Sequence, residues 1–524
     1  MKLNRRFSPL TLLLLSINGM VGSAWLFAPF YAAKMAGSGA IIAWLIAGGA
    51  TALIAFTFAE LSVLLPVAGG TAQIPQLSHG TFTSFMFSWV AWLSALTMAP
   101  IEVQAVLQYA STYFTGLTHM VNEVPMLTTT GLVWATILML FLCIFNIASF
   151  KGLVRFNFVL FVFKVAVILL VIGWLMKESF HPGNFAIPVD PNDGLGTWKA
   201  ILSAVAASGV AFAFTGFKHG VELAGEAKSK LAIFVAIVGS VLVCLLLYLG
   251  LQVAFIGALD PANLTSGWGH LTFMGDVGPF AGLAAALGLL VLLKFLYIDA
   301  VVSPLGAGLI YVTSTARIFY AMSKIGFFPA VFTKLNKQAF PWAAIMLNFV
   351  LGMFLFLPLP SWQSMVSFLV SGMVISYAAG PIALLCFRLS LKNEHRAFRL
   401  PAARFLCLIA FYCCNLMSYW TGWETIYKLA IAMVIGLGFF VWAYIRGRLE
   451  KEHLAMKSAV WVIPYFAGLI LISYLGAFGG KNVIPFGWDF LVMFVFSAVI
   501  LYLSVKYRSK AIATEYAAME PVVW

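Results

Sequence analysis

Charged side chains are scarce in this sequence of 524 residues. Asp, Glu, Lys and Arg together make up 9% of the chain, whereas apolar residues make up 62%. Ordinary soluble domains carry about 25% charged residues, so the composition excludes a soluble globular protein. It indicates a polytopic membrane protein, because a hydrocarbon core about 30 Å thick is crossed by runs of about 20 apolar residues.

Cysteine and histidine are also few, with six and seven residues. The cysteines all fall inside apolar runs and lack metal-ligand spacing, so we expect free thiols, no disulfide and no metal site. Only His219 lies deep in a predicted span, and no Ser/His/Asp arrangement is present. Without such machinery or a soluble signalling domain, the sequence favours neither an enzyme nor a sensor, and it indicates no cofactor.

Lys and Arg residues between the apolar runs predict the orientation in the membrane. We count about fourteen runs of spanning length, and short cytoplasmic loops hold the positive excess in such proteins. With the N-terminus inside, the cytoplasmic side receives Lys228, Lys230, the stretch 388–404 and the stretch 506–510. Both termini are therefore predicted to be cytoplasmic. The net charge of +13 is then a topology signal and not a surface for nucleic acid.

Two stretches do not fit a single straight span. Residues 66–82 contain Gly69, Gly70, Pro75 and Gly80, so we expect this segment to lie on the membrane or to dip into it. Residues 283–323 are too long for a perpendicular crossing at about 1.5 Å per residue. We expect them to form one tilted helix that extends into the cytoplasm.

Glycines interrupt two apolar runs that lie five spans apart, at residues 18–23 and 215–220. Each glycine lowers helix propensity by about 1 kcal/mol relative to alanine. An opened helix exposes N–H groups that suit a carboxylate and carbonyls that suit a cation. Breaks at matching positions of two halves indicate a transporter with a midplane binding site. The alternative is that the glycines only permit close helix packing.

Ionisable residues within predicted spans include, besides His219, the acids Glu102 and Asp299 and the lysines Lys164 and Lys218. Such a residue costs at least about 2.5 kcal/mol to insert, and therefore indicates a function. A structural ion pair is the alternative for both lysines, since Glu222 follows Lys218 at i+4. Either acid could pair with Lys164, Lys218 or Lys294 or accept a proton, and the sequence leaves the pairing open.

Several motifs resemble those of the amino acid-polyamine-organocation superfamily of permeases. The stretch from Gly22 to Phe27 resembles the first-helix signature, and its Trp25-Leu26-Phe27 continuation resembles that of bacterial aspartate–proton symporters. The further matches are Ala59-Glu60-Leu61 with Pro66, Gly69 and Gly70; Phe214 to Phe217 with Ala224, Glu226 and Lys228; and Arg317 to Met322 with Gly326, Pro329, Phe332 and Pro341.

This resemblance implies an all-α membrane protein with the leucine-transporter-type fold, in which helices 1 and 6 are broken. Residues 8–176 would form a first inverted repeat of helices 1 to 5, and residues 197–390 a second repeat of helices 6 to 10. Residues 402–508 would add helices 11 to 14, without a soluble domain. The resemblance to bacterial symporters also implies the cytoplasmic, or inner, membrane of a bacterium.

The resemblance further implies where an amino acid binds. Backbone amides at the first break would hold its carboxylate, and carbonyls of both breaks would hold its ammonium, with Phe212 as an aromatic gate. The residues implied to hold the carboxylate are Ser23, Ala24 and Trp25, and Gly22 is a further substrate-binding residue of the same break. The residues implied to hold the ammonium are Ile17, Asn18, Phe212 and Thr215. Ala24 departs from the family's third glycine, which places a methyl group near the site.

The resemblance implies secondary active amino-acid transport by alternating access. Some proton-coupled relatives place a lysine where Lys164 stands, which implies proton coupling through Lys164, and we expect Asp299 to be a second coupling residue. The expected partners are an amino acid, protons and membrane lipids. Lys218 faces the site in this scheme, with Glu102 lining it. A cation there attracts acidic substrates and repels basic ones, which favours an acidic or polar amino acid. An exchanger of the same fold is the alternative.

Overall fold

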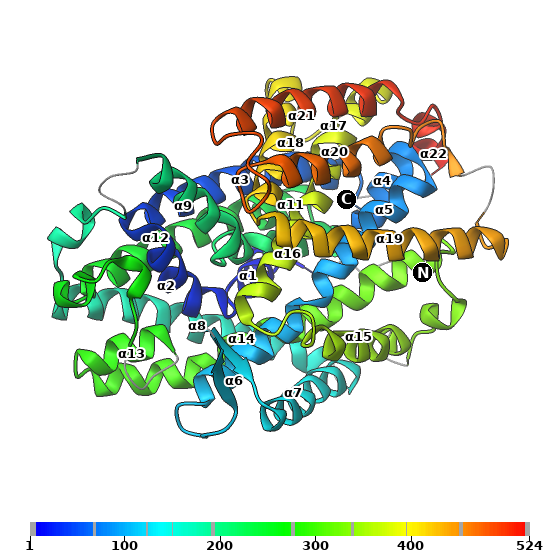
Figure 1. The fold of residues 1–524 in the computed structure, drawn as a ribbon. Coiled ribbons are helices and arrows are strands. Elements are labelled where there is room, and N and C mark those ends of the chain that lie inside the picture. The colour runs from blue at the N-terminus through cyan, green and yellow to red at the C-terminus, as the bar shows by residue number, and fades with distance from the viewer. Residues whose placement is uncertain are drawn as a thin grey trace.

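The structure is a computed structural model. It describes residues 7–66, 70–121, 124–148, 150–189, 194–273, 278–336, 340–392, 394, 396–449 and 454–518. Gly69 of the second-helix motif lies outside these residues. Nearly all the regular structure is helical, as Figure 1 shows.

The first half of the described chain contains twelve α-helices and one hairpin. Their bounds are α1 Pro9–Met20, α2 Ala24–Ala36, α3 Ala40–Leu64, α4 Gly70–His79, α5 Thr81–Leu96, α6 Met98–Ala110, β1 Thr118–Val121, β2 Val124–Leu127, α7 Thr129–Ala148, α8 Phe150–Glu178, α9 Gly194–Ala207, α10 Lys218–Glu222, α11 Lys230–Phe234 and α12 Ser240–Ala258.

The second half contains ten more α-helices in its described part. They are α13 Pro279–Ala286, α14 Leu290–Lys324, α15 Trp342–Leu355, α16 Trp362–Tyr377, α17 Ala379–Ser390, α18 Ala403–Tyr419, α19 Trp423–Ile445, α20 Val462–Leu475, α21 Trp488–Lys506 and α22 Ile512–Ala518. Short 3-10 or π turns are η1 Gly37–Gly39, η2 Pro182–Ala186, η3 Phe212–Phe217, η4 Ala224–Glu226, η5 Val235–Gly239, η6 Pro261–Leu264, η7 Trp268–His270 and η8 Ala330–Thr333.

Nine segments of the described chain are long and apolar enough to cross a membrane, and a bent pair of helices allows a tenth. The bent pair joins Gly196–Ala207 to Phe212–Glu222 at an angle of 41°. Four shorter apolar helices, α1, α15, α18 and α20, accompany them. The chain is thus a mostly helical membrane protein, while the count of fourteen spans stays a prediction that requires the bent pair and all four shorter helices to cross.

Three sequence expectations need correction or refinement. The chain is not entirely helical, because β1 and β2 form an antiparallel hairpin. The expected single helix over 283–323 is two helices, since Gly288 adopts a φ of +70° and separates α13 from α14. Within the segment 66–82, residues 70–79 form the buried helix α4, which packs against α5 and α17 and does not lie on the surface.

Helix α1 lies at the centre of the bundle. It packs against η3, α10, α12 and α14 of the predicted second repeat and against α8 of the predicted first repeat (Figure 1). Around this centre, α14 packs along α6 and α8, and α12 packs along α3 and α8. Because most side chains of α2, α5 and α6 are buried, polar groups on these helices lie in protein and not in lipid.

Segments predicted to be cytoplasmic lie together. Phe7 donates its N–H to the carbonyl of Glu226 at 3.1 Å and accepts from the N–H of Lys228 at 2.9 Å. Nearer the C-terminus, Nε of Arg508 donates to Oγ of Ser390 at 3.2 Å. This proximity agrees with the predicted sidedness, although the orientation of the termini stays a prediction.

Candidate functional site

The first helix break is held by side chains that reach it from three other helices. Helix α1 ends at Met20 and α2 begins at Ala24. The last carbonyls of a helix lack partners within that helix, so they need donors from elsewhere. The donors are Nζ of Lys164 to the Val21 carbonyl at 2.8 Å, the hydroxyl of Tyr248 to the Met20 carbonyl at 2.9 Å, and the hydroxyl of Tyr311 to the Gly19 carbonyl.

On the other side of the break, a carboxylate binds the start of α2. The N–H of Ser23 donates to Oε2 of Glu102 at 2.7 Å, and the Ser23 hydroxyl accepts from Nε1 of Trp362 at 3.0 Å. The other Glu102 oxygen, Oε1, has no hydrogen-bond partner within the described residues. A methyl group at Gly22 would collide with this carboxylate, so only glycine permits the approach.

Lys164 and two acids form a buried charge cluster behind the break. Lys164, Glu102 and Asp299 are all fully buried, and the lysine attracts both carboxyl groups electrostatically. Asp299 lies beside Ser303 and Trp25, but neither of its oxygens reaches hydrogen-bond geometry within the described residues. Two carboxylates and one ammonium leave one negative charge uncompensated. Since burying an unpaired charge is costly, the cluster is suited to hold a dissociable proton.

The second break follows Gly209, which adopts a φ of +97° between α9 and η3. Its carbonyls are held mostly by nearby hydroxyls: Phe212 accepts from Oγ1 of Thr215 at 2.8 Å, and Thr215 accepts from the hydroxyl of Tyr377 at 3.3 Å. No buried charge binds these two carbonyls among the described contacts. The second break therefore differs from the first in lacking an ionic clamp.

The two breaks touch each other through glycines. A methyl group at Gly216 would lie 2.6 Å from the backbone nitrogen of Met20, and one at Gly19 would collide with the ring of His219. Such distances are too short for real atoms, so these glycines permit the approach of α1 to η3 and α10. The sequence left helix opening and close packing as alternatives, and both occur at the first break. The second opening lies at residues 208–211, before η3, and not at the expected 215–220, so Gly216 serves close packing.

Lys218 lies beside the second break in an aromatic environment. Its Nζ is 4.1 Å from the ring centroid of Phe58 and 4.9 Å from that of Tyr377. Glu222 attracts it electrostatically, but the Glu222 carboxylate accepts its hydrogen bond from Ser314 at 2.5 Å. Lys218 also borders a small cavity, whose polar lining residues are Thr71, Thr215, Lys218, His219, Glu222 and Ser314.

Aromatic rings cover the opposite side of the first break. The Trp362 ring stacks on Tyr31 at a centroid distance of 5.7 Å and contacts Phe27 at 5.1 Å. Phe212 meets the same indole edge-on at 6.2 Å, and Tyr109 meets Phe27 at 5.3 Å. With the N-terminus inside, this cluster lies between the break and the outer face.

A protein-family model described as amino acid permease matches residues 7–440, which include both breaks and the buried cluster. The chain belongs to the amino acid permease family. This family is part of the amino acid-polyamine-organocation superfamily that the motifs resemble. The assignment makes the protein a transporter and not an enzyme.

Curated relatives of this permease cover nearly its whole length. It is 34% identical to the glutamate/serine transporter AimA of Bacillus subtilis over 96% of this chain and 94% of the relative. It is 31% identical to an aspartate-proton symporter of the same organism, over 94% of each chain. A more distant relative, 23% identical over 85% of this chain and 92% of its own, is an arginine/agmatine antiporter of Chlamydia caviae.

The permease brings some of the predicted site residues together and separates others. Ser23, Glu102, Lys164 and Asp299 meet at or behind the first break, as described above. Lys218 does not join them, because its ammonium lies against Phe58 and Tyr377. Of the lysines with which Glu102 and Asp299 could pair, Lys164 is the one that attracts both acids.

The remaining predicted residues are buried around the breaks of the permease. The Ile17 carbonyl accepts the Val21 N–H at 2.9 Å, so it still belongs to helix α1. Asn18 lies in the last turn of α1, and Ala24 is the first residue of α2. The Trp25 indole packs on Phe280 at a centroid distance of 5.6 Å.

Sequence reasoning missed three aromatic residues that shape this permease site: Tyr248, Tyr311 and Trp362. Each donates a hydrogen bond to the first break from a distant helix. Buried tyrosine and tryptophan need a partner for their polar atom, so a tyrosine in the middle of an apolar span could have drawn attention. The identity of that partner depends on the tertiary fold.

Proposed function

We propose that this permease is a proton-coupled symporter for an acidic or polar amino acid, working by alternating access. The observation that carries the proposal is the hydrogen bond from the Ser23 N–H to Glu102. A carboxylate of the protein occupies the helix N-terminus at which a substrate carboxylate is expected. In this scheme residues 8–176 and 197–390 are inverted repeats, helices 11 to 14 follow in 402–508, and both termini lie in the cytoplasm of a bacterium.

In the proposed mechanism, the substrate carboxylate replaces Glu102 on the Ser23 N–H. Two anions cannot share one helix N-terminus at low cost, so substrate binding favours a protonated or displaced Glu102. Glu102 lies near Lys164, and the Lys164 ammonium can balance the negative charge of the carboxylate while the proton is exchanged. Asp299 is the second acid that can take part. Substrate and proton are thus linked through one buried cluster.

The substrate class rests on Lys218 and on the relatives. Lys218 borders the same cavity as Thr215, whose backbone we expect to contact the substrate ammonium. A buried cation there favours an acidic side chain and opposes a basic one. The glutamate/serine transporter and the aspartate-proton symporter share about a third of their residues with this chain, which supports the same direction.

The decisive experiment is uptake of radiolabelled amino acids into liposomes that contain the purified protein. We expect aspartate, glutamate or serine to accumulate when the outside is acidic, without substrate inside the vesicles. The same panel includes arginine as the opposing case. Arginine as the best substrate would contradict the acidic preference, and accumulation that ignores the pH gradient would contradict proton coupling.

Exchange of two amino acids is the second candidate, because the arginine/agmatine antiporter is also a relative. An exchanger transports only when the lumen is preloaded. Uptake into preloaded vesicles alone, with none into empty vesicles under an imposed pH gradient, would favour this candidate over symport.

A further inference from the structure

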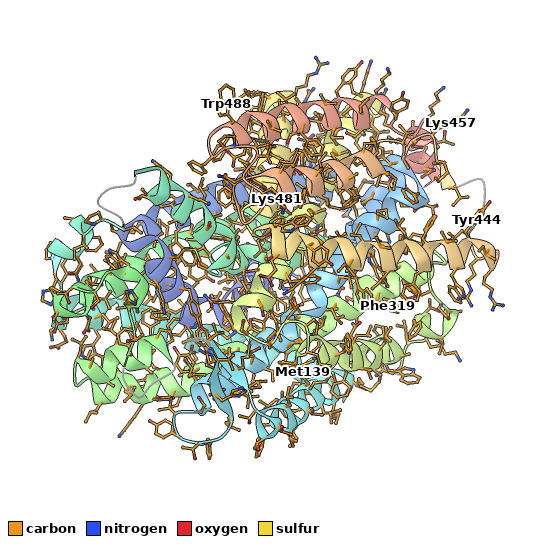
Figure 2. The ribbon with its side chains drawn as sticks, viewed as in Figure 1. Met139, Phe319, Tyr444, Lys457, Lys481 and Trp488 are labelled. Carbon is orange, nitrogen blue, oxygen red and sulfur yellow. The ribbon has the colours of Figure 1, made fainter. Side chains whose placement is uncertain are left out.

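A large cavity of the described chain lies away from both breaks. It has a volume of about 950 Å³ and runs between α19 and α15, with α5 and the end of α14 as its floor. Both α19 and α15 contact α5, and Figure 2 places Phe319 between α19 and α15. We call this cavity the α19 groove. Its lining is almost wholly apolar, so it is not a path for an amino acid.

The α19 groove opens sideways. Its floor residues Trp89, Trp92 and Phe319 are buried, whereas its wall residues Ile435 and Phe354 are more than half exposed. An exposed apolar wall on a membrane protein faces lipid. The groove is therefore a concave recess at hydrocarbon depth and not a sealed packing defect.

One face of α19 lines the groove along most of the helix. The lining positions on this helix are Lys428, Ile431, Ala432, Ile435, Gly438, Phe439 and Trp442. They follow the i, i+3, i+4 spacing of a single helix face and span fifteen residues, a rise of about 21 Å at 1.5 Å per residue. One leaflet of the hydrocarbon core is about 15 Å deep, so the groove is long enough for an extended acyl chain.

The two ends of the groove differ in charge. Near one end, Nζ of Lys428 is neutralised by Glu424 at 3.0 Å. At the other end, the guanidinium of Arg448 lies over the Trp442 ring at 4.8 Å, and no carboxylate of the described residues pairs with it. The Arg448 backbone packs on Gly326, close to the groove residue Phe328. An arginine that has no carboxylate partner within the described part of the chain thus marks the end that is predicted to be cytoplasmic.

We propose that the α19 groove binds an anionic phospholipid of the inner leaflet, with an acyl chain along α19 and the phosphate group at Arg448. Basic residues at the cytoplasmic end of a recess between membrane helices suit an anionic headgroup, and the aromatic floor suits a chain. A second copy of the protein would have to supply a long narrow ridge to fill the same recess. The cation at one end favours the lipid.

The test uses purified full-length protein and native mass spectrometry, with phosphatidylglycerol and phosphatidylcholine of identical chains added in detergent. We expect phosphatidylglycerol to be retained in preference. Gly438→Phe fills the groove, because nothing lies within 4 Å of a side chain begun at Gly438. It should lower retention of both lipids about tenfold. Gly173→Phe is the matched control, since Gly173 on α8 has the same open surroundings outside the groove.

Substitutions at Arg448 test whether this residue binds the lipid headgroup. Arg448→Gln should remove the preference for phosphatidylglycerol while phosphatidylcholine binding persists, and Arg448→Lys should keep the preference. Equal retention by the wild type and Gly438→Phe would overturn the groove as the binding site. Retention of a free fatty acid in place of phospholipid would contradict a phospholipid as the occupant. A dimer that Gly438→Phe disrupts would mean that a second copy of the protein, and not a lipid, fills the groove.

Discussion

Lys164 and Lys218 are both buried lysines next to a helix break, but their surroundings differ in kind. The Lys164 ammonium donates to the Val21 carbonyl and faces two carboxyl groups. The Lys218 ammonium lies against two aromatic rings, and the acid that attracts it is bound to Ser314. A cation among acids can exchange protons with them, whereas a cation over rings keeps its charge in place. From this contrast we propose that the first lysine serves coupling and the second serves selectivity.

The largest effect is expected when the ionic cluster loses its cation. Lys164→Ala leaves Glu102 and Asp299 without a counter-charge and the Val21 carbonyl without a donor, and breaking a buried pair costs about 3–5 kcal/mol. Uptake driven by a pH gradient in proteoliposomes should be abolished. Lys294→Ala is the matched control, because Lys294 is exposed on α14. Undiminished gradient dependence of Lys164→Ala would remove the coupling role.

The next effect concerns the carboxylate that occupies the helix N-terminus. Glu102→Gln keeps an oxygen that can accept from the Ser23 N–H but has no proton to exchange. Gradient-driven uptake should fall about tenfold, a cost of about 1.4 kcal/mol. Exchange between preloaded vesicles should survive, because it needs no net proton movement. Loss of both activities together would indicate a purely structural Glu102.

A smaller and more selective effect is expected at the second lysine. Lys218→Met keeps an unbranched apolar stem against Phe58 and Tyr377 but removes the charge. The KM for aspartate and glutamate should rise about tenfold, in line with about 1–2 kcal/mol for a desolvated cation. The KM for serine should change little, and Lys218→Arg should restore the acidic preference. Equal losses for serine and aspartate would mean that Lys218 only packs.

The smallest effect tests whether the first break depends on groups other than Lys164. Trp362→Phe keeps a ring against Tyr31 and Phe27 but removes the donor to the Ser23 hydroxyl. A lost hydrogen bond of this kind costs about 1 kcal/mol. We expect the melting temperature to fall by about one degree, because a long chain has a large unfolding entropy, and pH coupling to be unchanged. A changed dependence of uptake on the pH gradient would mean that Trp362 takes part in proton coupling.

The local parts of this arrangement could be predicted from the sequence. Glycine weakens a helix wherever it stands, so the spacing of Gly19 and Gly22 indicated a break in the place where α1 ends and α2 begins. The cost of burying charge likewise singled out Glu102, Lys164 and Asp299. These inferences need only the residue and its apolar neighbours.

The rest depends on contacts between distant parts of the chain. The bond from Ser23 to Glu102 joins residues 79 positions apart, and that from Tyr311 to Gly19 joins residues 292 apart. No periodicity encodes which tyrosine reaches which carbonyl. The position of Lys218 against Phe58 was missed for the same reason, since α3 approaches α10 only in the folded bundle. The turn at Gly288 was hidden because its neighbours are apolar.

The backbone pairing of Phe7 has a consequence for how motion can be measured. Its two main-chain hydrogen bonds join the start of α1 to the segment after α10, and Gly216 packs against the backbone of Met20 further along. Because α1 contacts the segment around η3 and α10 at these two places, we expect the two to move together as one piece. Distance labels placed on both of its halves would stay silent during a transport cycle. Labels that report opening belong on this piece and on helices outside it.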